Sequence, residues 1–131
     1  MSHAPLKKGF KQLLAEANAI VESVDVRHAL PLAGDASVQF VDVRDGHELA
    51  ASGRIPGAVH APRGFLEFIA DPDGPMHKKE FSSGKKLVLF CATGGRSALA
   101  ARQLMEMGFA NVAHMPGGFA AWNAAGGPVE R

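Results

Sequence analysis

The segment that most constrains the fold is the run at residues 87–90, four apolar residues in succession. A strand that alternates apolar and polar residues can leave one face in water, whereas a strand that is apolar at every position is buried on both faces. Strands of this kind are typical of parallel sheets that carry helices on both sides. The run therefore predicts an α/β protein with this strand inside its sheet.

Shorter β-type runs and helical patterns alternate along the rest of the chain. The other candidate strands are residues 38–43 and 111–115, a run around Val59 and a weaker run around Val21. The candidate helices are residues 25–33, residues 45–52, a stretch that begins near Gly64, and residues 96–107. Because strands that alternate with helices favour parallel pairing, we expect an α/β domain of three layers, with a central parallel five-stranded sheet flanked by helices.

Glycine, proline and polar residues mark where the chain leaves these elements. Residues 70–86 are polar and contain both proline and glycine, which predicts a surface excursion before the central strand. Gly108 stands where the helix at 96–107 needs a left-handed C-terminal cap, and Phe109 is placed to fold back on the preceding turn.

The N-terminal residues form a unit of their own in the predicted organisation. We expect residues 1–18 to be a helical extension and residues 19–131 to be the α/β domain. The pattern predicts that Phe10, Leu13, Leu14 and Ala17 face inward while the lysines face water. Binding of this helix to a membrane surface is the less favoured alternative, because few positive charges support it.

Composition excludes several classes of function. A net charge of +1 gives no reason to expect a nucleic-acid partner, and no apolar run approaches the roughly 18 residues of a membrane span. One cysteine allows no internal disulfide, which suits a reducing compartment and predicts a cytoplasmic protein. The six histidines are scattered, so we expect surface or capping roles for them and no metal or other cofactor.

The single cysteine, Cys91, directly follows the apolar strand. Four small residues come next, Ala92, Thr93, Gly94 and Gly95, and Arg96 then opens a helix. Ligands of α/β sheets bind beyond the carboxyl ends of the strands, and a curled loop of N–H groups at a helix N-terminus binds anions. Taken singly, these residues are explained by a buried thiol, a turn and a surface ion pair. Together they predict a thiolate with a pKa below the free value of about 8.5, and hence a nucleophile.

Several motifs in fixed order resemble the single-domain rhodaneses, a family of sulfurtransferases. The matching residues are Asp42 and Arg44 at a strand end, Glu48, the turn at residues 53–58, the loop residues Cys91, Gly94, Arg96 and Ser97, the pair Gly117 and Gly118, and Trp122. The resemblance extends over residues 21–129. It departs at Arg54, where the family often has histidine, and we expect this change to be tolerated.

The resemblance implies a rhodanese-like fold and a reaction in which Cys91 accepts sulfane sulfur as a persulfide. The donor would be a small molecule such as thiosulfate, and the acceptor would be cyanide, a thiol or a sulfur-carrier protein. Arg96 would neutralise an anionic donor, while residues 92–95 and Ser97 would surround the sulfur. Asp42, Arg44 and Glu48 would support the loops, with Arg44 and Glu48 as a candidate ion pair.

Three further expectations concern neighbours of the site and the alternatives. Arg63 and His77 lie in segments that could overhang the strand edge. Cysteine phosphatases and arsenate reductases resemble this cradle, but phosphatases need five residues between cysteine and arginine, and no second cysteine is present to complete arsenate reduction. A non-catalytic rhodanese-like module is the other alternative, although inactive versions of the fold commonly lose the cysteine.

Overall fold

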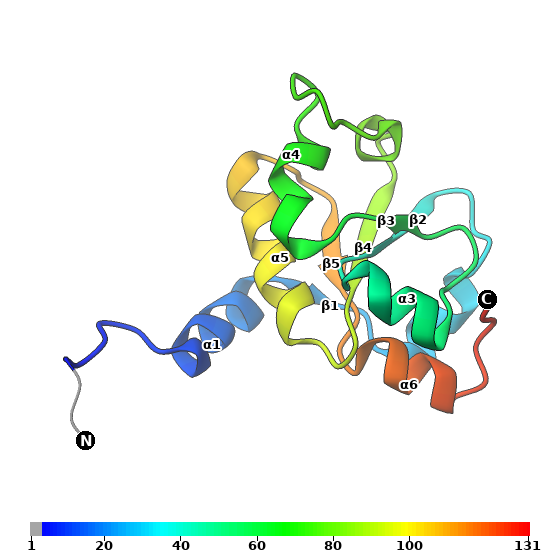
Figure 1. The fold of residues 1–131 in the computed structure, drawn as a ribbon, viewed down its shortest axis with the longest axis horizontal. Helices are drawn as coiled ribbons and strands as arrows, with labels where there is room; N and C mark the ends of the chain where they lie inside the picture. The colour runs from blue at the N-terminus through cyan, green and yellow to red at the C-terminus, as the bar shows by residue number, and fades with distance from the viewer. Residues whose placement is uncertain (1–3) are drawn as a thin grey trace.

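The sheet has the five parallel strands that the sequence predicts. The computed structural model describes residues 4–131 and orders the strands β1-β5-β4-β2-β3, with β4 in the middle (Figure 1). The strands are β1 (Glu22–Ser23), β2 (Val38–Asp42), β3 (Val59–His60), β4 (Lys86–Phe90) and β5 (Val112–His114). Phe90 of β4 stands opposite Asp42 of β2, and Leu89 stands opposite His114 of β5. The carboxyl ends of the three inner strands therefore meet at one edge.

Helices cover both faces of the sheet and complete the three layers. On one face, α4 (Leu66–Ala70) and α5 (Gly95–Met107) bury Ile69, Leu104 and their neighbours against the strands. On the other face, α2 (Val26–Ala29) and α6 (Gly118–Ala124) enclose a second cluster around Phe40 and Trp122. The helix α3 (Gly46–Ser52) buries none of its residues and lies beside the carboxyl edge, near α6 (Figure 1). The predicted α/β architecture is confirmed.

Local chemistry explains where the helices begin and end. Asp45 begins α3 with a capping box, in which its side chain accepts from the Glu48 N–H and the Glu48 side chain accepts from the Asp45 N–H. Gly108 ends α5 with a φ of +109°, and the Phe109 N–H donates to the Leu104 carbonyl, as predicted. These caps set where α3 begins and where α5 ends.

Some predicted boundaries were wrong. The strand expected around Val21 is limited to Glu22–Ser23, because α1 (Phe10–Ile20) continues to Ile20. The helix expected over residues 25–33 is only Val26–Ala29 followed by a 3-10 turn at Leu30–Leu32, since Pro31 lacks the N–H that an α-helix needs. A 3-10 turn at Arg63–Phe65 precedes α4, and another, Lys79–Ser82, lies in the excursion. The sequence did not predict α6 at all.

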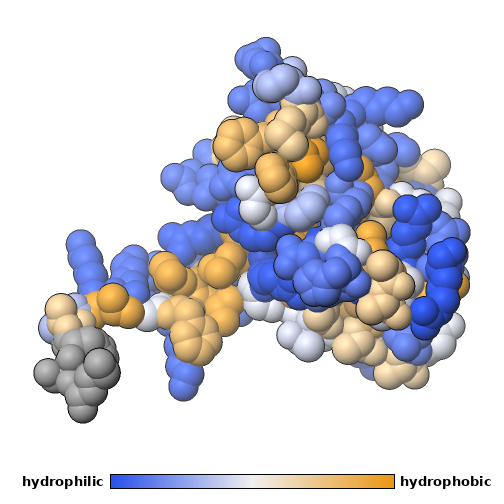
Figure 2. All heavy atoms as spheres, in the orientation of Figure 1, coloured by the Kyte–Doolittle hydropathy of each residue, from blue (hydrophilic) through white to orange (hydrophobic). Residues whose placement is uncertain are grey.

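The orientation predicted for the N-terminal helix was partly wrong. Ala17 is buried and Leu14 is half-buried, but Phe10 is 68% exposed and Leu13 is 37% exposed. The reason is that α1 packs mainly along α5, so only part of its apolar surface has something to contact. Figure 2 shows the resulting apolar side chains gathered over α1. No helix in residues 4–131 has the length and apolar character needed to cross a membrane.

Candidate active site

Cys91 lies at the carboxyl end of β4, the middle strand, and its side chain is buried. The chain turns sharply after it, and Gly94, the N-cap of α5, has a φ of +122° that favours glycine. This turn points the Gly94 N–H back at Cys91, with 3.0 Å between the nitrogen and Sγ. The hydroxyl of Ser97, in the first turn of α5, lies 3.7 Å from the same sulfur.

The carbonyl groups of this loop are bound by the start of α6. The Phe119 N–H donates to the Cys91 carbonyl (2.8 Å) and the Ala120 N–H donates to the Ala92 carbonyl (3.1 Å). The Gly117 N–H donates to the Thr93 carbonyl (3.2 Å) in the same way. Because the carbonyls face α6, the loop's N–H groups are free to turn toward the sulfur. Gly118 permits this contact, since a Cβ there would lie 2.7 Å from the Ala92 carbonyl oxygen.

The loop stabilises the anionic form of the thiol. Burial raises the pKa of Cys91, but the N–H groups of Ser97, Gly94 and Thr93 and the Ser97 hydroxyl lower it by more, so that the pKa lies below its ordinary value. Of the residues predicted to surround the sulfur, the structure thus brings Thr93, Gly94 and Ser97 to it. The Ala92 carbonyl faces α6, as the Thr93 carbonyl does, and Gly95 is the first residue of α5.

Arg96 is held by Glu48 across the edge of the site. The Arg96 Nη1 donates to Glu48 Oε2 (2.8 Å) and Nη2 donates to Oε1 (2.9 Å), a two-point contact between α5 and α3. The guanidinium lowers the pKa of Glu48 to about 2, and Glu48 in turn raises the pKa of Arg96. The predicted Arg44–Glu48 ion pair is therefore wrong, because Glu48 pairs with Arg96 while Arg44 pairs with Asp42.

Asp42 and Arg44 form a buried pair beneath the loops. Arg44 Nη2 lies 2.8 Å from Asp42 Oδ2 and donates to the Gly53 carbonyl, while Nη1 donates to Ser52 Oγ. The same guanidinium lies 4.2 Å from the ring centre of Phe119 in α6. The pair joins the end of β2 to the end of α3 and to α6, which is the loop-tying arrangement that the sequence predicts.

Sequence reasoning missed His114. This residue is buried in β5, and its Nδ1 lies 3.0 Å from Ser97 Oγ. The expectation that every histidine has a surface or capping role is wrong here, because β5 is an inner strand between β1 and β4. The only signal in the sequence was the position of His114 within an apolar β-type run.

Arg63 and His77, the two residues expected to overhang the site, are engaged by local partners. Arg63 Nη1 donates to Glu67 Oε1 (3.0 Å), one turn further along the same helical segment. His77 Nδ1 lies 3.1 Å from the Ile69 carbonyl, and its Nε2 lies 2.7 Å from Ser82 Oγ. The His77 contacts join the excursion to Ile69 of α4 and connect two of its own residues.

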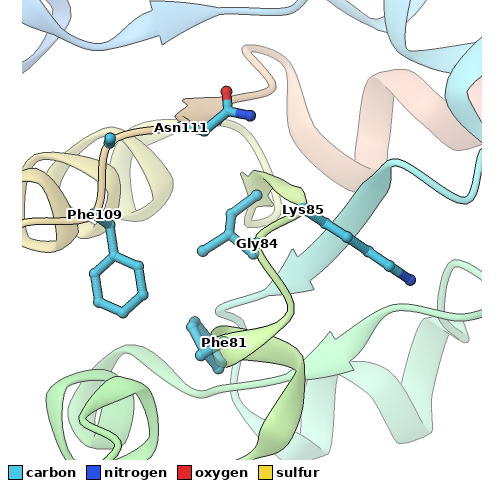
Figure 3. A pocket seen from close by; sticks show the side chains of 7 residues that line it. Phe81, Gly84, Lys85, Phe109 and Asn111 are labelled. Atoms are coloured by element: carbon cyan, nitrogen blue, oxygen red, sulfur yellow. The ribbon is translucent and has the colours of Figure 1, made fainter.

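Two hollows differ in their relation to Cys91. A groove of about 390 Å³ lies between α3 and α6, and it is lined by Ala92 of the loop together with His47, Phe119 and Asn123. A smaller hollow of about 190 Å³ lies at the opposite, amino-terminal edge of the sheet (Figure 3). Its lining includes the rings of Phe81 and Phe109. Only the first hollow borders the cysteine loop.

Comparison with known proteins gives consistent matches. The model of the rhodanese-like domain family matches residues 25–125. Thiosulfate sulfurtransferase 16 (chloroplastic) of Arabidopsis thaliana is 33% identical over 82% of this chain and 90% of its own length. Thiosulfate sulfurtransferase GlpE of Shewanella oneidensis is 40% identical over 68% of this chain and 79% of its own.

A solved structure from Rhodopseudomonas palustris matches nearly the whole chain. It is described as a protein of unknown function and a possible tyrosine phosphatase. The two chains are 43% identical, with a TM-score of 0.93 over 99% of this chain and 100% of the other.

Proposed function

Because the chain belongs to the rhodanese-like domain family, we propose that it is a sulfurtransferase that carries sulfane sulfur as a persulfide on Cys91. One observation carries this proposal. The sulfur of the only cysteine sits at the carboxyl end of the middle strand and accepts the Gly94 N–H at 3.0 Å. A sulfur held in this way is favoured as a thiolate, the form that attacks another sulfur atom.

The proposed reaction consists of two nucleophilic displacements at sulfur. The Cys91 thiolate attacks the outer sulfur of thiosulfate, forming a new S–S bond while the bond to the sulfite group breaks, and sulfite leaves with the electron pair. Cyanide or a thiolate then attacks the terminal sulfur of the persulfide, and Cys91 leaves as a thiolate. The loop N–H groups stabilise negative charge on sulfur at both stages.

The acceptor must be a separate molecule, because the chain has no second cysteine to take the sulfur. We propose a small thiol, cyanide or a sulfur-carrier protein for this role, with no nucleic acid or membrane involved. The groove between α3 and α6 borders the loop at Ala92 and gives such a partner a place to approach. A single free thiol also agrees with a cytoplasmic protein.

Intact-mass measurement after incubation with thiosulfate tests the proposal. We expect the wild type to gain one sulfur atom, which cyanide removes, and Cys91→Ser to gain none, because a hydroxyl is a far weaker nucleophile at neutral pH. Circular dichroism of Cys91→Ser checks that the fold is kept. Retained transfer by the serine variant would exclude the covalent mechanism, and no gain by the wild type with any sulfane donor would favour a non-catalytic module.

A phosphatase is the second candidate, because the Rhodopseudomonas palustris relative is described as a possible tyrosine phosphatase. Four residues separate Cys91 from Arg96 here, whereas the phosphatase cradle needs five to surround a tetrahedral phosphate. The shorter loop favours a single sulfur atom. We expect a ring of this size to bring backbone against the phosphate oxygens before phosphorus comes within attack distance.

Loop length can be changed directly. We expect the wild type to be inert toward aryl phosphates, and a glycine inserted between Gly94 and Gly95 to depress sulfur transfer by enlarging the ring. Thiosulfate:cyanide transfer and aryl-phosphate hydrolysis would be measured on both proteins, with Cys91→Ser as the blank. Phosphatase turnover by the wild type that depends on Cys91 would replace the sulfurtransferase assignment.

A further inference from the structure

Three buried side chains from separate elements form a line that ends at the reactive sulfur. Ser97 Oγ, in the first turn of α5, lies 3.7 Å from Cys91 Sγ and 3.0 Å from His114 Nδ1 in β5. None of the three residues is more than 2% exposed. The pairing of β4 with β5 brings the histidine to this place, because Leu89, two residues before the cysteine, stands opposite His114.

The hydrogen-bond partners of Ser97 favour one position for the hydrogen on the imidazole of His114. The Ser97 hydroxyl has one hydrogen, and it donates to the Gly94 carbonyl, which can only accept (3.1 Å). The thiol form of Cys91 also uses Ser97 Oγ as its acceptor. With that hydrogen on the Gly94 carbonyl, the 3.0 Å contact between Oγ and Nδ1 is a hydrogen bond in which the nitrogen donates, and we assign the hydrogen to Nδ1 on this basis.

The rest of the imidazole agrees with this tautomer. The other nitrogen, Nε2, is buried and has no hydrogen-bond partner among the described residues. A charged ring would place an N–H at that position with nothing to accept it, which is costly in the interior. Burial also lowers the pKa of His114, which keeps the ring neutral at pH 7.

We propose that His114 is a positioning residue for the sulfur chemistry, which acts through Ser97. Its Nδ1–H occupies one lone pair of Ser97 Oγ, so the serine keeps its own hydrogen for donation. When Cys91 loses its proton or gains a sulfur, that hydrogen turns from the Gly94 carbonyl to the negatively charged sulfur. A hydroxyl that accepts a hydrogen bond is itself a stronger donor. This inference rests on the proposed role of Cys91 as the reacting group.

Two substitutions at His114 separate positioning from packing. His114→Phe keeps a ring in the space but removes the donor, whereas His114→Asn places an amide nitrogen where Nδ1 stands. The measurement is the rate of Cys91 alkylation by iodoacetamide as a function of pH, which reports the thiol pKa. We expect His114→Phe to raise that pKa and slow alkylation at pH 7 roughly three- to tenfold, the factor that one ordinary hydrogen bond is worth. The asparagine variant should stay close to the wild type.

Ser97→Ala and the double variant complete the test. Ser97→Ala should slow alkylation at least as much as His114→Phe, and combining the two should add little, because both act through the same hydroxyl. His28→Phe, a change at an exposed histidine of α2, is the control and should have no effect. An unchanged alkylation profile in His114→Phe, or an additive double variant, would overturn the proposal.

The wild-type protein gives a second readout if His114→Phe does not fold. Nitrogen-15 NMR of the imidazole should show hydrogen on Nδ1 and none on Nε2 at pH 7. Hydrogen on Nε2 alone, or a charged ring, would contradict the proposal. Neither measurement requires a sulfur donor, so a failure of sulfur transfer is distinguished from a failure of this inference.

Discussion

At the scale of single residues, the reactivity of Cys91 is a balance between burial and hydrogen bonding. Burial alone would keep the thiol protonated, and the directed N–H groups of Gly94 and its neighbours reverse this. The arginine of the cysteine motif, Arg96, is already bound by the Glu48 carboxylate. Backbone geometry therefore contributes more to the thiolate than the sequence motif suggests, and the arginine's charge is partly offset.

The charge balance at Arg96 can be shifted in both directions. Arg96→Ala should raise the thiol pKa and weaken anionic donors more than neutral ones, on the order of tenfold, because it removes the cation. Glu48→Gln should favour anionic donors, since it leaves the guanidinium without its counter-charge. Transfer rates with thiosulfate and with an uncharged persulfide donor measure the effect. Equal losses for both donors in Arg96→Ala would show that the arginine only shapes the loop.

At the scale of elements, the first turn of α6 is part of the site although it offers no reactive side chain. Its N–H groups bind the carbonyls of residues 91–93, and this requires the backbone of α6 to approach the loop closely at Gly118. The first turn of α6 thus acts as a template for the loop, because its N–H groups hold the three carbonyls in one orientation. The predicted role of Gly117 and Gly118 as a turn was incomplete for this reason.

Gly118→Ala tests the template. The residue has a φ of +57°, and a Cβ would meet the carbonyl oxygens of Cys91 and Ala92. We expect a loss of roughly 2–5 kcal/mol in the free energy of unfolding and a slower Cys91 alkylation, because the loop must move. Gly126→Ala is the matched control, since its φ is +79° but nothing lies within 4 Å of the added carbon. It should lose only about 1–2 kcal/mol, and equal effects of the two changes would contradict the template.

The elements also show how far sequence reasoning reaches. The apolar run at 87–90 predicted the buried central strand, because a strand that is apolar at every position is buried on both of its faces. The helix α6 was missed because it has only seven residues and begins directly after Gly117, where the glycine pair was interpreted as a turn. Contacts between distant positions were also missed, such as Glu48 with Arg96 and Ser97 with His114. These depend on how helices lie on the sheet, which local patterns do not encode.

At the scale of the whole molecule, ion pairs as well as strand pairing join the elements at the carboxyl edge of the sheet. The Glu48–Arg96 pair connects α3 with the first turn of α5. Beneath it, the Asp42–Arg44 pair connects β2 with the end of α3 and with α6. The fold at this edge is therefore held partly by charge.

The Glu48–Arg96 pair makes the free energy of unfolding depend on pH. Folding lowers the pKa of Glu48 from an ordinary 4.5 to about 2, so its contribution is complete above pH 4.5 and is lost as the pH falls toward 2. Urea unfolding of the wild type and of Glu48→Gln should differ by about 0.5–1 kcal/mol at pH 6, the range for a partly exposed pair. The difference should shrink as the pH falls to 3. A difference that does not change with pH would show that the charge of Glu48 is not involved.

The central position of β4 has a consequence for motion. Strands β2 and β5 bond to it on either side, and residues 87–90 are all buried. Peripheral parts such as α1 can detach by local fluctuations, whereas the middle strand separates only when the whole domain opens. Cys91 is anchored to that strand. The nucleophile thus follows the strand that opens only with the whole domain, so local unfolding at the periphery does not change the position of its sulfur.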